Sequence, residues 1–254
     1  MKYSSFSGSN TLDFGGICAM CMPIDATGLP VAPGGPSAAG TVLRAAVYID
    51  GFNLYHAIAD LGAPHLKWVN LRALSERIIR KGERLERVVW CTAVNTKNTQ
   101  KMLRWRAYKK AQESVGVAVL VGHFTEEPRR CHQGHDYFHP TEKEGDVNLA
   151  ISVISDGHLN VYDVAYVVTA DSDQVATAKM VMDRLPEKQF ISVAPPGRSH
   201  SKEIITNSDD TRVIRRETLE NCLFDGPTII KGGELIAARP PLYAPPEGWQ
   251  PAAI

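Results

Sequence analysis

The stretch that decides the fold covers residues 45–55 and reads Ala-Ala-Val-Tyr-Ile-Asp-Gly-Phe-Asn-Leu-Tyr. Its first half is apolar and β-branched at Val47 and Ile49, which is typical of a buried strand. Asp50 then ends the strand, Gly51 permits a tight turn, and the residues that follow begin a helix. A carboxylate at this edge of an α/β sheet lies where ligands bind, but Asp50 alone is equally well explained as a helix cap.

The composition is that of an ordinary soluble globular chain. The 254 residues include 28 Lys and Arg and 28 Asp and Glu, so the formal net charge is +0. Any nucleic-acid site must therefore be a local basic patch. No apolar run approaches the roughly 20 residues that span a bilayer. The start lacks a secretory signal, and the five cysteines are scattered, so we expect a cytoplasmic protein with no membrane segment.

The domain boundaries follow the composition along the chain. Residues 1–43 are rich in Gly, Pro, Ser and Ala, and we expect a disordered or loosely attached arm. The Cys18-Ala-Met-Cys21 motif inside it is a weak zinc signal, because no second pair accompanies it. Residues 44–224 form the predicted domain, and residues 225–254 form a Pro-rich tail, which we expect to be loose from Ala238 onward.

Strands and helices alternate through the predicted domain. This rhythm predicts an α/β fold in which a mostly parallel sheet carries helices on both faces. Residues 125–142 are polar and aperiodic, and we expect a loop or an insertion there. Neither a dinucleotide-binding glycine motif nor a P-loop is present. The predicted strands cover residues 45–49, 85–94, 117–121, 164–168, 190–193 and 213–214, and the main predicted helices cover residues 71–79, 99–114, 144–154 and 172–185.

Two further stretches carry carboxylates. Residues 165–173 read Ala-Tyr-Val-Val-Thr-Ala-Asp-Ser-Asp, an apolar strand followed by Asp171 and Asp173. Residues 142–150 read Glu-Lys-Glu-Gly-Asp-Val-Asn-Leu-Ala and place Asp146 in the first turn of an amphipathic helix. Taken singly, each of these acids is explained as a helix cap or as a first-turn acid that the helix dipole favours.

Taken together, the acids predict a metal site. The carboxyl ends of parallel strands share one edge, so Asp50, Asp171 and Asp173 are expected to gather there, within reach of Asp146. Two carboxylates about 4 Å apart repel by about 4 kcal/mol at an effective dielectric near 20. A hard cation with oxygen ligands, Mg²⁺ or Mn²⁺, would balance them and activate water for phosphodiester cleavage.

Three motifs then resemble a known family. Residues 47–55, 142–150 and 167–173 occur in the order seen in NYN-domain proteins. Over roughly residues 44–224 the chain resembles the LabA-like branch of that family, which belongs to the PIN-like nuclease group. The resemblance implies a PIN-like α/β/α sandwich, a Mg²⁺-bound acidic site and a ribonuclease that leaves a 5′-phosphate.

The same resemblance assigns the site residues. By motif position, Asp50, Asp146, Asp171 and Asp173 match the acidic site, as catalytic residues and metal ligands. Asn53 matches the Asn of the first motif and would orient a ligand or phosphate.

Two segments outside these motifs have open interpretations. Many relatives carry a C-x-x-C-like element before the Glu-Lys motif, whereas this chain offers Cys131, His135 and His139. These three suit zinc, but a solvated polar loop explains them at least as well. In the helix of residues 99–114, Lys101 and Arg104 share a face, which would track an RNA backbone or simply face solvent.

The leading prediction is a metal-dependent endoribonuclease with RNA as its partner. A phosphatase is an alternative, with Asp171 as nucleophile and Asp173 as acid, but it leaves Asp50 and Asp146 unexplained. A non-catalytic RNA-binding or regulatory module is a second alternative. The sequence leaves a homo-oligomer open.

Overall fold

The computed structural model describes residues 42–94 and 97–252. Most of the predicted N-terminal arm, with its Cys18–Cys21 motif, lies outside the described residues. Within the described ranges, no helix combines the length and the apolar character that crossing a bilayer requires.

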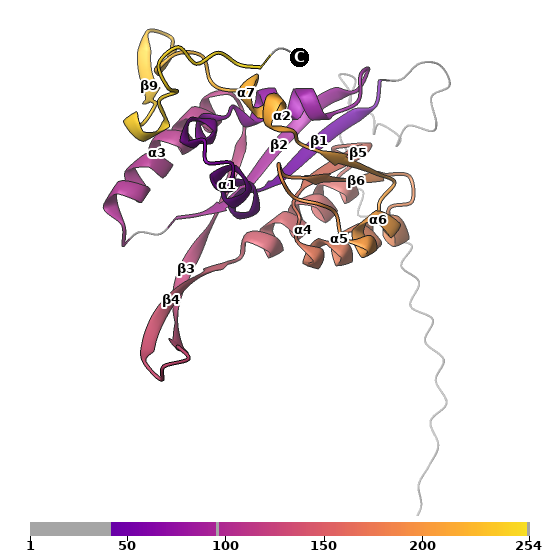
Figure 1. The fold of residues 1–254 in the computed structure, drawn as a ribbon. Coiled ribbons are helices and arrows are strands. Elements are labelled where there is room, and N and C mark those ends of the chain that lie inside the picture. Colours follow the sequence, from indigo (N-terminus) through magenta and orange to yellow (C-terminus); the bar gives the residue numbers. More distant parts are fainter. Residues whose placement is uncertain (1–41, 95–96, 253–254) are drawn as a thin grey trace, which may run out of the picture. The chain divides into compact units, whose positions relative to one another are not determined.

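A seven-stranded sheet forms the centre of the domain (Figure 1), in the order β4-β3-β2-β1-β5-β6-β7. Neighbouring strands run parallel except β3 and β4, which are antiparallel. Its strands are β1 (Arg44–Asp50), β2 (Arg84–Ala93), β3 (Ala118–Arg130), β4 (Asp136–Lys143), β5 (Val164–Val168), β6 (Gln189–Ala194) and β7 (Asp210–Val213).

Helices cover both faces of this sheet. One face carries α1 (Gly51–Asp60), the 3₁₀ helix η2 (Pro64–Trp68), α2 (Leu71–Ile78), α3 (Thr99–Ser114) and α7 (Arg216–Glu220). The other carries α4 (Gly145–His158), the 3₁₀ turn η3 (Ser172–Gln174), α5 (Val175–Arg184) and α6 (Lys202–Thr206). The predicted α/β class, a mostly parallel sheet with helices on both faces, is confirmed.

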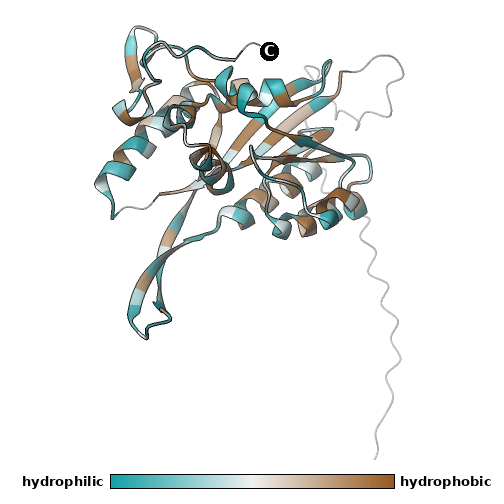
Figure 2. Ribbon diagram, viewed as in Figure 1, coloured by the Kyte–Doolittle hydropathy of each residue, from teal (hydrophilic) through white to brown (hydrophobic). Residues whose placement is uncertain are grey.

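Strand β1 is the centre of the core, because it lies between β2 and β5 and is buried on both faces. Val47 and Ile49 pack against the α1 and α2 side, and Ala46 and Tyr48 pack against the α4 and α5 side. Figure 2 shows the same contrast, with hydrophobic central strands and more hydrophilic outer helix faces. A strand buried on both faces needs a continuous apolar run, which explains why residues 45–49 lack polar alternation.

Of the two interpretations of residues 125–142, the loop is wrong. Over most of this segment, the end of β3 and the strand β4 form an antiparallel hairpin. In this hairpin His123 pairs with Lys143, and Arg130 pairs with Asp136. The hairpin extends away from the rest of the domain (Figure 1). The hairpin therefore has little buried surface that would require alternating apolar residues. Its polar side chains instead pair across the strands, as the ammonium of Lys143 does with the carboxylate of Glu127 at 2.7 Å.

The segment after residue 224 contains elements that the sequence did not predict. It forms a second hairpin of β8 (Thr228–Lys231) and β9 (Glu234–Ala238), followed by the 3₁₀ turn η4 (Pro241–Tyr243). Ala237 and Tyr243 are buried in one cluster with Trp68 and Phe224. Proline is compatible with the first turn of a helix such as η4, so a Pro-rich segment can still pack against the domain.

Candidate metal centre

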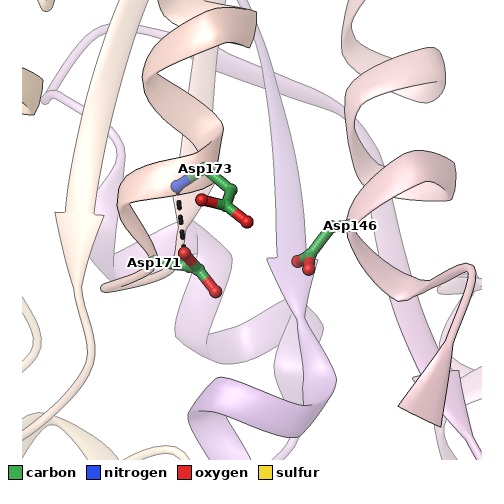
Figure 3. Close-up of side chains that lie close together, drawn as sticks. All are labelled: Asp146, Asp171 and Asp173. Atoms are coloured by element: carbon green, nitrogen blue, oxygen red, sulfur yellow. Dashed lines mark hydrogen bonds between the residues drawn. The ribbon is translucent and has the colours of Figure 1, made fainter.

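Three carboxylates converge at the carboxyl edge of the sheet. Carboxylate oxygens of Asp146, Asp171 and Asp173 all lie within 4.8 Å of one another. Asp171 follows β5, Asp173 lies in η3, and Asp146 lies in the first turn of α4. Figure 3 shows Asp146 pointing from α4 towards the other two. The structure thus brings together three of the four predicted acids.

Local hydrogen bonds fix this arrangement. The carboxylate of Asp171 accepts a hydrogen bond from the backbone N–H of Asp173 at 2.9 Å and so caps η3 (Figure 3). The buried side chain of Gln174 donates to the backbone carbonyl of Asp146 at 3.3 Å. This second bond ties the start of α4 to η3, so the two elements that carry the acids are held side by side.

Asp50 lies beside the three acids and also caps a helix. One of its carboxylate oxygens accepts the backbone N–H of Asn53 at 2.9 Å, at the start of α1. Burial raises the pKa of Asp50 to about 6, and the negative charges of Asp146 and Asp171 act in the same direction. The hydrogen bond from Asn53 acts in the opposite direction. The capping role and the acidic-site role are therefore compatible, because each carboxylate oxygen has a second lone pair.

Thr169 links the two central strands, and sequence reasoning missed it. Its hydroxyl donates to the second oxygen of Asp50 at 3.0 Å and accepts the backbone N–H of Asp171, also at 3.0 Å. Its side chain is buried. The only signal in the sequence is its place between an apolar strand and Asp171, where a hydroxyl interrupts the apolar run.

Glu142 is a further acid of the site that the prediction omitted. Its carboxylate lies against Gly145, where an added Cβ would be 2.3 Å from Oε1. Burial and the charges of Asp50 and Asp146 raise the pKa of Glu142 to about 7. Glu142 begins the Glu-Lys-Glu-Gly-Asp motif, but the predicted loop gave no reason to turn its side chain towards the site.

The approach of α1 to β2 requires a glycine. A Cβ on Gly51 would lie 2.2 Å from Nε1 of Trp90 and 2.5 Å from the carbonyl oxygen of Cys91. The Cys91 thiol is buried, and burial together with nearby carboxylates raises its pKa to about 12. Cys91 is therefore a neutral packing residue beside the acids and is a poor candidate for a nucleophile or a metal ligand.

The zinc alternative receives no support from the geometry. In residues 42–94 and 97–252, the Asp146, Asp171 and Asp173 group is the only His, Cys, Asp or Glu cluster whose ligand atoms converge. Cys131 and His135 lie at the turn of the β3–β4 hairpin, where the backbone N–H of Cys131 bonds to the carbonyl of His135. His139 lies farther along β4 and lines a pocket beside α1.

The predicted substrate-binding residues lie on the helices α1 and α3. Lys101 and Arg104 lie in α3 and line the pocket beside α1, whereas Asn53 lies in the first turn of α1, partly exposed. Their roles as RNA contacts stay a prediction.

The donor set fits a hard divalent cation. The converging ligands are all carboxylate oxygens, which suit Mg²⁺ or Mn²⁺. Burial, and after it the repulsion of neighbouring carboxylates, raises the pKa values of Asp50, Asp146 and Glu142 and so disfavours their charged forms. A bound cation would remove that penalty.

Comparison with known proteins places this geometry in a family. Residues 44–215 match the family model of the NYN domain. The chain belongs to the NYN domain family. This is a PIN-like nuclease family, so the acidic edge of this NYN domain lies in a nuclease-like fold.

More distant comparisons add little. A search of curated proteins gave no match. Among solved structures, the NYN domain is similar to a protein of unknown function from Vibrio parahaemolyticus, at 14% identity and a TM-score of 0.48. That match covers 70% of this chain and 96% of the other.

Replacing Glu142 with Gln should change how stability depends on pH. An acid whose folded pKa is raised stabilises the fold only while protonated, so that contribution is lost as pH rises from about 4.5 to about 7. In EDTA, we expect Glu142→Gln and the unmodified chain to melt alike near pH 4, and the variant to melt higher near pH 8, by a few degrees. Thermal melts across this range measure the difference. If the melting temperatures of the two proteins changed equally with pH, the pKa of Glu142 would not be raised in the folded state.

Proposed function

We propose that this NYN domain is a metal-dependent endoribonuclease. The convergence of Asp146, Asp171 and Asp173 at the carboxyl edge of the sheet supports this proposal most directly. Asp50 and Glu142 lie beside them and add to the local negative charge. A site that repels its own anions needs a cation before an anionic phosphodiester can enter, and the family is one of nucleases.

The roles of the individual residues follow from their positions. Asp146, Asp171 and Asp50 would hold Mg²⁺ or Mn²⁺, and the exposed Asp173 would be a further ligand or orient the attacking water. When bound, the cation would lower the pKa of water and neutralise charge on the phosphate, and the cleaved strand would carry a 5′-phosphate. Thr169 would hold Asp50 and Asp171 in place without touching the substrate.

Several finer assignments belong to the same proposal. The three sequence motifs support placement in the LabA-like branch and a nuclease unit of residues 44–224. Asn53, Lys101 and Arg104 would contact RNA. Within the described residues, the three cysteines are free thiols, which supports a reducing compartment such as the cytoplasm.

The two alternatives make different use of the acids. A phosphatase that attacks through Asp171 would form a covalent aspartyl-phosphate, but it gives no role to Asp146 or Glu142, which face the same site. A non-catalytic module would bind RNA without cleaving it in Mn²⁺.

Replacing Asp146 with Asn should abolish cleavage with little change in fold. Asp146 is exposed on α4, so the loss would reflect a lost anionic ligand. We expect the RNA cleavage rate in Mn²⁺ to fall at least about a hundredfold, which corresponds to about 2.7 kcal/mol. The stabilisation by Mn²⁺ in thermal melts should shrink as well.

The matched control is Asp183→Asn, which makes the same change on an exposed acid of α5 away from the site. It should cleave normally. Cleavage by the unmodified chain in excess EDTA, or by Asp146→Asn at the normal rate, would contradict the proposed site.

Removing Lys101 and Arg104 together should weaken RNA binding and its dependence on salt. Each phosphate contact releases counterions, so the double alanine variant should flatten the slope of log K against log salt by about 1.4 for single-stranded RNA. The control is Arg106→Ala with Lys110→Ala, which removes two exposed cations of α3 that do not line the pocket. Binding titrations in EDTA at several salt concentrations measure both slopes. An equal change in the control would mean that α3 acts only through its overall charge.

A further inference from the structure

A pocket of about 370 Å³ opens beside the acidic edge, between α1, α3 and the strands β2 to β4. Its volume lies at the lower end of the roughly 300–1,000 Å³ range of small-molecule sites. Most of its lining is aromatic or aliphatic, and three cations join it. The aromatic rings include Phe52, Tyr55, Trp90, Trp105, Tyr108 and Phe124, and the cations are Lys67, Lys101 and Arg104.

The inner wall of the pocket is built from fixed rings. Trp90 and Tyr108 pack edge to face with centroids 5.2 Å apart. The hydroxyl of Tyr108 donates to the backbone carbonyl of Val69 at 2.8 Å, and Nε1 of Trp105 donates to the hydroxyl of Thr92 at 3.4 Å. Because these rings have partners, the wall is organised before any ligand arrives.

The mouth of the pocket exposes aromatic surface. The side chains of Phe52 and Tyr55 are 45% and 41% exposed. Phe52 packs against His56 with ring centroids 4.3 Å apart, and the ammonium of Lys67 lies 4.1 Å from the centre of the Tyr55 ring. Exposed aromatic faces flanked by cations suit a flat ligand that carries negative charge.

Two residues that line the pocket are neighbours of acids of the site. Gly51 lines the pocket and follows Asp50 in the chain. Phe124 also lines it, and Phe124 is the cross-strand partner of Glu142. A ligand in the pocket would therefore continue into the region where the carboxylates gather.

We infer that this pocket receives one unstacked nucleobase of a single-stranded RNA, with Lys101 and Arg104 at the phosphates next to it. The inference rests on the proposed function, for which it names the form of the substrate. A single base can stack on the aromatic walls, and the cations match the backbone charge. A paired base cannot enter, because it would first have to leave its stack.

The test removes each partner of the proposed contact in turn: the base from the RNA, and the aromatic rings from the protein. The ligands are a fluorescent oligouridylate and an abasic ribose-phosphate oligomer of the same length, titrated in EDTA so that no cleavage occurs. The proteins are the full chain, the double variant Phe52→Leu with Tyr55→Leu, and the control Tyr137→Leu. Leucine keeps apolar bulk but removes the flat ring, and Tyr137 is a comparably exposed ring on the hairpin, outside the pocket.

We expect the full chain and the control to bind oligouridylate about tenfold more tightly than the abasic oligomer, the effect of stacking one base. The double variant should bind the two equally, with an unchanged melting temperature. Equal binding of both oligomers by the full chain, a tenfold preference that survives in the double variant, or equally good competition by duplex RNA would overturn the inference.

The two proposals fail in different ways. A base preference that depends on Phe52 and Tyr55, without cleavage in Mn²⁺, would support the pocket and contradict the nuclease. Cleavage in Mn²⁺ without any base preference would contradict the pocket and leave the nuclease intact.

Discussion

The hydroxyl of Thr169 is the contact on which the site depends. It joins the ends of the two central parallel strands by donating to Asp50 and accepting from the backbone of Asp171. Each of these acids in turn caps the helical element that follows its strand. The same bonds that begin α1 and η3 therefore set where the carboxylates lie. The positions of Asp50 and Asp171 are a consequence of how two strands end, and Asp146 joins them from α4.

This arrangement is electrostatically unfavourable, because it gathers carboxylates that repel one another. Asp50 and Glu142 have pKa values raised to about 6 and about 7, because burial and neighbouring carboxylates disfavour their charged forms. The core on both faces of β1 supplies the packing that holds the acids together despite this repulsion. A cation that relieved the penalty would stabilise the fold and prepare the site for an anionic substrate at the same time.

The sequence could predict the centre of this fold better than its edges. Residues 45–50 and 164–171 carry an apolar run that ends in a carboxylate, and this pattern follows from burial on both faces. The hairpin of β3 and β4 could not be predicted, because a strand exposed on both faces has no apolar periodicity. The orientation of the Glu142 side chain depends on this hairpin, so it could not be predicted either. Thr169 could not be assigned in advance, since its role depends on a hydrogen bond between distant residues.

The central claim is that the acidic edge binds one divalent cation, and calorimetric titration with Mn²⁺ tests it most directly. If binding deprotonates Asp50 and Glu142, the chain should release about one proton or more near pH 6 and almost none near pH 8. Titrations in buffers of different ionisation enthalpy count these protons. One bound Mn²⁺ with this pH-dependent release is the predicted result. No binding at either pH, or binding that Asp146→Asn leaves unchanged, would contradict the account.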